Sequence, residues 1–161
     1  MFSETAAAMS ELMASLLRTG GMSHALNYLN GRVPHRFTAL YRLEGDRLRN
    51  VFLQDKAGIR PLFLQNLPLD GSYCRLAIRD GSFSTDDASH DRRLAGHPLQ
   101  DVVLCYHSVP ICAESGEVLG TVSHFDVECC ATLNNQEFEF LHVAARLLRD
   151  HMGPPGTRAG R

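Results

Sequence analysis

The chain has 161 residues, of which 44% are hydrophobic and 21% are charged. These proportions are close to globular averages and exclude a wholly disordered chain, while the length fits one domain. The 16 basic and 18 acidic residues leave a formal net charge of -2, so no general basic field points to nucleic acid or to an anionic membrane surface.

The apolar runs are too short for a membrane-spanning helix. The longest uninterrupted run covers residues 102–106, whereas a transmembrane helix needs about 20 residues. The loosely apolar segment 6–17 contains Glu11 and has no basic leader, so it does not resemble a signal peptide. The five cysteines are an odd number and do not suggest a disulfide framework. We therefore expect a cytoplasmic protein without a membrane anchor.

The first section of the chain is predicted to be helical. Met9, Met13 and Leu17 recur at helical spacing, and Gly20-Gly21 ends this first helix. A second, short helix is predicted from Ser23, which can cap it, to Gly31.

Two strand pairs follow, separated by a mixed segment. Residues 37–43 and 48–54 form a predicted hairpin, and residues 102–112 and 117–127 form another around the turn at 114–116. Gly120 marks a place of close backbone approach. Between the pairs we expect a short helix over 72–79, a brief strand over 82–85 and a long polar loop over 86–100, the kind of loop that often carries function.

A long final helix is predicted from Asn134, with Glu137 completing a capping box. It carries two apolar stripes, one through Leu141 and Leu148 and one through Phe140 and Leu147. A sheet buries only one stripe, so the other needs the first helix or a second protomer.

The order of elements predicts the α+β class. We expect a central antiparallel sheet of about five to six strands flanked by helices, with the N- and C-terminal helices packed together. Residues 1–152 form one predicted domain, in which an N-terminal helix over 1–20 precedes a core over 22–152. A flexible tail is predicted over 153–161.

From Ser72 onward the sequence resembles the GAF domain, the small-molecule sensor module of signalling proteins. The motifs that carry the resemblance are Ser72-Tyr73-Cys74, residues 83–87 ending in Asp, Asp91-Arg92-Arg93-Leu94 with His97-Pro98-Leu99, residues 106–111, and residues 118–122 with Phe125-Asp126. They cover 72–152, whereas 22–54 fit only by the order of elements. The sequence departs from the pattern at His107, where a small residue is usual. It also lacks the Asn-Lys-Phe-Asp-Glu signature of cyclic-nucleotide members, and Gly96 stands where bilin-binding relatives carry a cysteine.

The resemblance implies a pocket between one sheet face and the middle helix and loop. It places the following ligand-binding residues near that pocket: Tyr73, Cys74, Asp86, Asp87, His90, His97, Tyr106, His107 and Ser108. Structural roles as core aromatics and turn caps are the alternative for such residues. The resemblance further implies a non-catalytic sensory or regulatory module that binds an unidentified small molecule, dimerises through its terminal helices and signals to a separate output protein.

Two cysteines open further hypotheses. Cys74 lies in the first turn of a predicted helix, where the dipole favours a thiolate, so a thiol-dependent reductase of free methionine sulfoxide is one alternative; some GAF proteins have this activity. Cys105 and His107 are two positions apart on a predicted strand and therefore share a face. Cys74 from the helix, and His124 or Asp126 from the partner strand, can approach them. A site for zinc or iron is therefore a second hypothesis. The spacing matches no specific metal motif, so no metal ligand is assigned. A pure dimerisation scaffold with a filled pocket also remains open.

Overall fold

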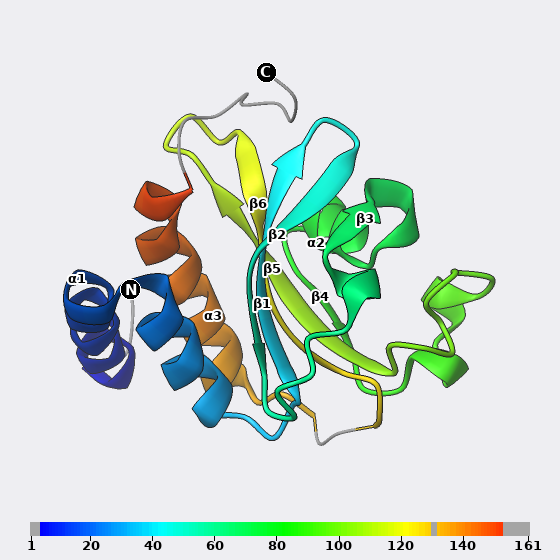
Figure 1. The fold of residues 1–161 in the computed structure, drawn as a ribbon, viewed down its shortest axis with the longest axis horizontal. Coiled ribbons are helices and arrows are strands. Elements are labelled where there is room, and N and C mark those ends of the chain that lie inside the picture. Colours follow the sequence, from blue (N-terminus) through cyan, green and yellow to red (C-terminus); the bar gives the residue numbers. More distant parts are fainter. Residues whose placement is uncertain (1–3, 130–131, 153–161) are drawn as a thin grey trace.

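The computed structural model describes residues 4–129 and 132–152. Within this part of the chain, six strands form one antiparallel sheet with the order β3-β2-β1-β6-β5-β4, and helices lie on both of its faces (Figure 1). The strands are β1 (Phe37–Glu44), β2 (Arg47–Asp55), β3 (Asn66–Pro68), β4 (Phe83–Thr85), β5 (Cys105–Cys112) and β6 (Val118–Asp126); the helices are α1 (Glu4–Gly31), α2 (Cys74–Asp80) and α3 (Asn135–Leu148). The predicted α+β class is confirmed.

The centre of the sheet is the pairing of β1 with β6. Their register places Thr38 opposite His124 and Arg42 opposite Gly120. A Cβ atom at Gly120 would collide with the carbonyl oxygen of Tyr41, so only glycine permits this approach, as the sequence predicted. At one end of the sheet, β4 covers only residues 106–108 of β5. The remaining edge of β5 contains Pro110, which has no N–H to offer a further strand.

The helices α1 and α3 pack on one face of the sheet and against each other (Figure 1). The predicted break at 20–21 occurs as a kink inside α1, where Gly21 has φ 70° and ψ -164°. On α3, Leu141 and Leu148 are buried, and so are Phe140 and Ala144 on the second stripe. Within one chain, α1 therefore covers the stripe that the sheet leaves free.

The start of α3 is tied to the end of α1. Asn134 caps the helix, because its Oδ1 accepts a hydrogen bond from the Glu137 amide at 2.9 Å. The Glu137 carboxylate binds the Arg32 guanidinium instead of completing the predicted box, with Arg32 Nη2 at 2.9 Å and Nε at 3.2 Å. Arg32 also lies over the Phe140 ring, with its Cζ atom 4.3 Å from the ring centroid.

The opposite face of the sheet is covered by α2 and by two segments with little regular structure, 56–72 and 86–104. A second core lies there, which includes Phe37, Tyr41, Tyr73 and Phe125. Two sequence expectations change: β5 begins at Cys105 rather than at residue 102, and β3 was not predicted. The predicted tail over 153–161 lies outside the described residues. None of the described helices combines the length and the hydropathy needed to cross a bilayer.

Candidate functional site

A small pocket lies between α2, the sheet and the two covering segments. Its volume is about 20 Å³, which is room for about one water molecule. The residues that line it come from β1, β5, β6, α2 and the covers: Tyr41, Leu64, Leu67, Ser72, Tyr73, Cys74, Leu99, Val103, Tyr106 and Phe125. None of these ten side chains belongs to the charged amino acids.

The polar side-chain atoms of the lining are the Cys74 thiol and four hydroxyls, those of Ser72 and of the three tyrosines Tyr41, Tyr73 and Tyr106. The Cys74 Sγ atom lies 2.8 Å from the Tyr106 hydroxyl and 3.2 Å from Thr121 Oγ1. Tyr73 donates to the Val103 carbonyl at 3.1 Å, and Tyr41 donates to the Leu64 carbonyl at 2.7 Å. Burial raises the pKa of all three phenols, so they remain neutral donors.

The local sequence explains why Cys74 faces the pocket. The Ser72 Oγ atom accepts a hydrogen bond from the Cys74 amide at 3.1 Å, which sets the start of α2. The helix ends at Gly81, which has φ 86° and donates its amide to the Ala77 carbonyl. Cys74 and Ala77 are therefore buried against the sheet.

The structure separates the nine predicted site residues into three places. Tyr73, Cys74 and Tyr106 line the pocket, and His97 packs against Tyr73 with ring centroids 4.6 Å apart. Ser108 lies beyond the lining on the same face, where its Oγ atom accepts from Ser123 Oγ at 2.8 Å.

The other four predicted residues do not line this pocket. Asp86, Asp87 and His90 lie in a surface depression that also includes Asp91. The predicted position of His107 is corrected, because neighbouring residues of a strand point to opposite faces and His107 therefore points away from Tyr106.

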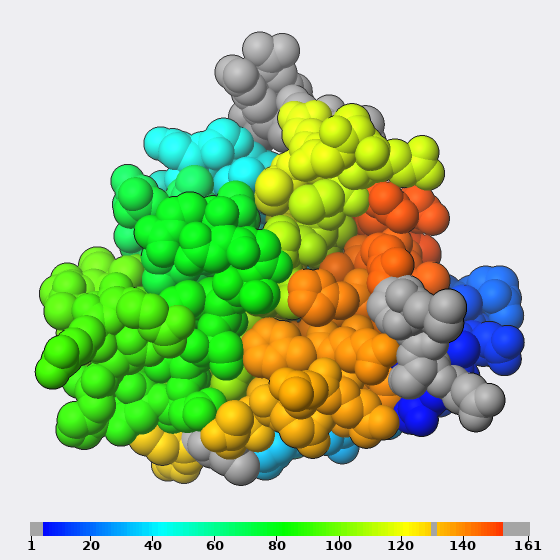
Figure 2. Space-filling view, turned by 180° about the vertical axis from the view of Figure 1, so that it is seen from behind, coloured from blue at the N-terminus to red at the C-terminus, as the bar shows by residue number. Residues whose placement is uncertain are grey.

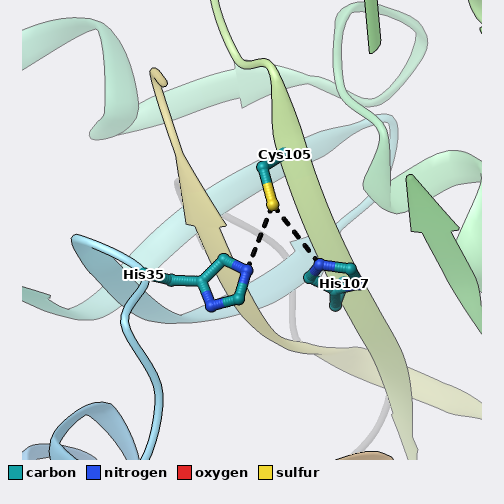
Figure 3. A group of neighbouring side chains, drawn as sticks. All are labelled: His35, Cys105 and His107. Atoms are coloured by element: carbon teal, nitrogen blue, oxygen red, sulfur yellow. Dashed lines mark hydrogen bonds between the residues drawn. The ribbon is translucent and has the colours of Figure 1, made fainter. Parts of the chain in front are cut away.

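His107 belongs to a fully buried cluster on the α1 and α3 face of the sheet. Cys105 Sγ lies 3.1 Å from His35 Nε2 and 3.4 Å from His107 Nε2 (Figure 3). His35 comes from the connection between α1 and β1, and the other two come from β5. The predicted shared face of Cys105 and His107 is present, whereas Cys74 lies on the opposite face and does not join them.

Surrounding side chains orient the histidines of this region. Ser84 Oγ lies 2.6 Å from His107 Nδ1, and Thr38 Oγ1 lies 2.7 Å from His124 Nδ1. Burial, with a smaller contribution from His35, lowers the pKa of His107 to about 4. Burial also lowers the pKa of His35 and His124, so all three rings are neutral at pH 7.

Sequence reasoning missed His35, because it lies in a connection without periodicity, 70 residues before Cys105. The proximity of His124 follows from the register, which pairs it with His107. Asp126 pairs with Cys105, and its Oδ2 accepts the Arg36 amide at 2.9 Å. His35, just before β1, lies at the end of the sheet where β5 begins with Cys105, and only the folded chain brings the two residues together.

A wider groove lies between the open edge of β5 and α3, where yellow-green residues meet orange and red ones in Figure 2. Its volume is about 640 Å³, and it is lined by Pro110, Cys112, Ala113, Asn135, Phe138, Glu139, His142, Ala145, Arg146 and Arg149. This groove is wide and is lined in part by charged residues, in contrast to the small uncharged pocket by α2.

No protein-family model matches the sequence, and no curated protein is similar enough to match it either. Solved structures do match. The GAF domain of an Acinetobacter phosphoenolpyruvate-protein phosphotransferase has a TM-score of 0.74 at 12% identity, covering 94% of each chain. The chain has the GAF fold. A putative GAF sensor protein from Burkholderia vietnamiensis has a TM-score of 0.69 at 18% identity, covering 92% of this chain and 93% of that one.

One further GAF-fold neighbour is an enzyme. The free methionine-R-sulfoxide reductase from Neisseria meningitidis has a TM-score of 0.70 at 15% identity, covering 94% of this chain and 92% of that one. At such identities the likeness establishes the fold alone, and one GAF fold supports both sensors and reductases.

Proposed function

We propose that this chain is a non-catalytic sensory module that binds a small, uncharged molecule in the pocket by α2. The observation that carries the proposal is the pocket lining, which is apolar apart from hydroxyls and a thiol and contains no charged residue. A charged ligand buried there would lose its hydration without gaining a counter-charge. A neutral ligand with one hydrogen-bonding group suits the lining better.

Binding requires an outward movement of residues 57–65, which belong to the covering segment 56–72 and are called the cover below. The present space of about 20 Å³ is too small for a metabolite. Leu64 closes the pocket, and the hydrogen bond from Tyr41 to its carbonyl must break on opening. Ile59 and Leu62 on the cover are 69% and 86% exposed, so the cover is loosely packed. A ligand that prefers the open cover shifts this equilibrium and so creates a signal.

Thermal unfolding with a defined panel of probes tests the proposal. The neutral probes are phenol and indole; the charged probes are cyclic AMP, cyclic GMP and the zwitterion methionine-R-sulfoxide. A free probe at 100 times its Kd stabilises the fold by about 2.7 kcal/mol, which raises Tm by roughly 5–10 °C for a domain of this size. We expect such a shift with a neutral probe and none with the charged probes.

Matched tyrosine variants locate the binding. Tyr106→Phe removes a pocket hydroxyl and is expected to weaken a bound probe by roughly 3–10-fold. Tyr28→Phe removes an α1 hydroxyl that accepts a hydrogen bond from Arg32, far from the pocket lining, and is expected to leave probe affinity unchanged. Stabilisation by charged probes alone, or equal losses in both variants, would contradict the proposal.

The reductase alternative is tested in parallel, because Cys74 lines the pocket and solved reductases share the fold. The wild-type chain is incubated with methionine-R-sulfoxide and dithiothreitol, and free methionine is measured. We expect no turnover, since a zwitterionic amino acid has no charged partner in the pocket. Turnover that disappears in Cys74→Ser would replace the sensor proposal with the enzymatic one.

The proposed signal passes through a dimer of terminal helices to a separate output protein in the cytoplasm. Two exposed apolar residues on the outer face of α1 support this dimer: Ala8 and Leu12 are four positions apart, and Leu12 is 43% exposed. Leu12→Glu is expected to convert a dimer into a monomer in light scattering, whereas the neighbouring Glu11→Gln is expected to leave it intact. A monomeric wild type would exclude this route. The cysteines Cys74 and Cys105 are free thiols, which suits the proposed reducing compartment.

A further inference from the structure

We propose that His35, Cys105 and His107 form a binding site for a divalent transition-metal ion of the Zn²⁺ type. The site is independent of the small-molecule pocket, because it lies on the opposite face of the sheet, under α1 and α3. Two imidazoles and one thiol converge there from two segments 70 residues apart (Figure 3).

The spacing of the donor atoms fits a tetrahedral ion. Bonds of about 2.3 Å to sulfur and about 2.0 Å to nitrogen place these ligand atoms about 3.5 Å apart. The two sulfur-to-nitrogen distances in the cluster are 3.1 Å and 3.4 Å. The donor atoms of His35, Cys105 and His107 all lie within 4.8 Å of one another, so small side-chain movements are sufficient to close around an ion.

The chemistry of the donors also fits. Neutral imidazole and thiolate are the ligands that Zn²⁺ and neighbouring borderline ions prefer. Binding converts the Cys105 thiol to a thiolate and releases its proton to solvent.

One feature of the supporting contacts points to a ligand. Ser84 Oγ, 2.6 Å from His107 Nδ1, leaves Nε2 of that ring directed at the sulfur, as the outer hydrogen-bond partner of a metal-bound histidine does. The His35 side chain is completely buried, yet its Nδ1 atom has no hydrogen-bond partner among the described residues. This atom is not the Nε2 that faces Cys105, so it calls for a bound water outside the three-donor cluster.

A carboxylate lies close to one of the three donors. Asp86 Oδ1 lies 3.9 Å from His107 Nε2, and the Asp86 side chain is 46% exposed. It lines the surface depression with Asp87 and Asp91. One carboxylate and one thiolate balance the charge of a divalent ion.

The position of the site links helices to the sheet. His35 lies just before β1 and follows α1 by four residues, while the His107 ring lies 5.8 Å from Phe138 of α3. An ion held here would therefore fix the end of α1 against β5.

The experiment uses the full, untagged chain stripped of metal with EDTA. Zn²⁺ binding is measured by calorimetry, and Co²⁺ binding by absorption. We expect one ion per chain, a thiolate-to-cobalt charge-transfer band in the near ultraviolet, and a rise in Tm with Zn²⁺ that EDTA reverses. Cys105→Ser is expected to abolish the band and to weaken Zn²⁺ binding at least 100-fold, and His107→Gln to weaken it similarly.

Control variants separate this site from other thiols and from misfolding. Cys74→Ser, a buried cysteine on the opposite face, is expected to keep both the band and the affinity. Ser84→Ala and the partly exposed Asp86→Asn retain all three buried ligands and are expected to weaken Zn²⁺ binding by about 10–100-fold. Absence of Co²⁺ binding, a band that persists in Cys105→Ser, or a Tm that does not respond to Zn²⁺ in the wild type would overturn the proposal.

Discussion

The strongest test of how the cover is held is the substitution Asp55→Asn at the end of β2. The Asp55 side chain is fully buried, and its carboxylate accepts five hydrogen bonds. Two come from the Arg36 guanidinium, at 2.7 and 3.0 Å, and three come from the amides of Ala57, Ile59 and Arg60, at 2.9, 3.1 and 2.8 Å. Arg60 has φ 52°, a conformation that needs such support.

The expected loss of stability in Asp55→Asn follows from how the five hydrogen bonds are divided between the two carboxylate oxygens. Oδ1 accepts two of the five bonds and Oδ2 accepts three, so an amide nitrogen placed at either position faces at least two donors. Bonds to a charged group contribute about 1.5–3 kcal/mol each. Losing two predicts a free energy of unfolding lower by about 3–6 kcal/mol, a large part of a typical domain's stability.

Urea unfolding followed by circular dichroism provides the assay, with Asp80→Asn as the control. Asp80 is a surface residue paired with Arg79, and its substitution is expected to leave the unfolding midpoint unchanged. A decrease below about 1 kcal/mol for Asp55→Asn would refute the reasoning, because the five contacts would then contribute little. Unchanged m-values would show that both variants unfold as the wild type does.

The pH dependence of this difference gives an independent check. Burial alone raises the pKa of Asp55, but the hydrogen bonds from Arg36 and from the Arg60 and Ala57 amides outweigh it and hold the pKa well below its usual range. A depressed pKa contributes stability above the unfolded value of about 3.9, and that stability is lost as pH falls toward the folded value. The gap between wild type and Asp55→Asn is therefore expected to be constant from about pH 5 to 7 and to narrow below about pH 4.

Three further substitutions test the fold around the two sites. Gly120→Ala forces a Cβ atom onto the Tyr41 carbonyl and is expected to lower stability by about 3 kcal/mol, measured as a fall in Tm; an unchanged Tm would contradict the close β1–β6 approach. Lys56→Met removes an ammonium that donates to the carbonyls of Asn30, Val33 and His35, and is expected to lower the free energy of unfolding by about 1–2 kcal/mol, with Lys56→Arg as a milder control. Glu137→Gln weakens the ion pair with Arg32 and is expected to lower the free energy of unfolding by about 1 kcal/mol, measured by urea unfolding. No change would mean that packing alone joins α1 to α3.

The fold was largely predictable because local signals and family resemblance agreed. The capping residue Asn134, the break at Gly20-Gly21 and the close approach at Gly120 each mark a backbone requirement that few residue types satisfy. β3 was not predictable, since a three-residue strand with Pro68 at its end has no periodicity.

The candidate sites were predictable only in part. Strand alternation predicts that Cys105 and His107 share a face, but the same rule separates His107 from Tyr106, which the family resemblance had placed beside one pocket. His35 reaches the cluster through the path of the chain between α1 and β1, and no local pattern encodes that path. The volume of the pocket depends on how Leu64 packs, which is a property of the tertiary structure.

The central claim is that a pocket without charged residues responds to uncharged small molecules by moving its cover. The chain contains no tryptophan, so Phe63→Trp, at a cover position that is 43% exposed, creates a single fluorescent reporter. We expect a saturable change in its emission with phenol, and a weaker response when Tyr106→Phe is added. No change with phenol, or a change only with cyclic nucleotides or methionine sulfoxide, would contradict the claim.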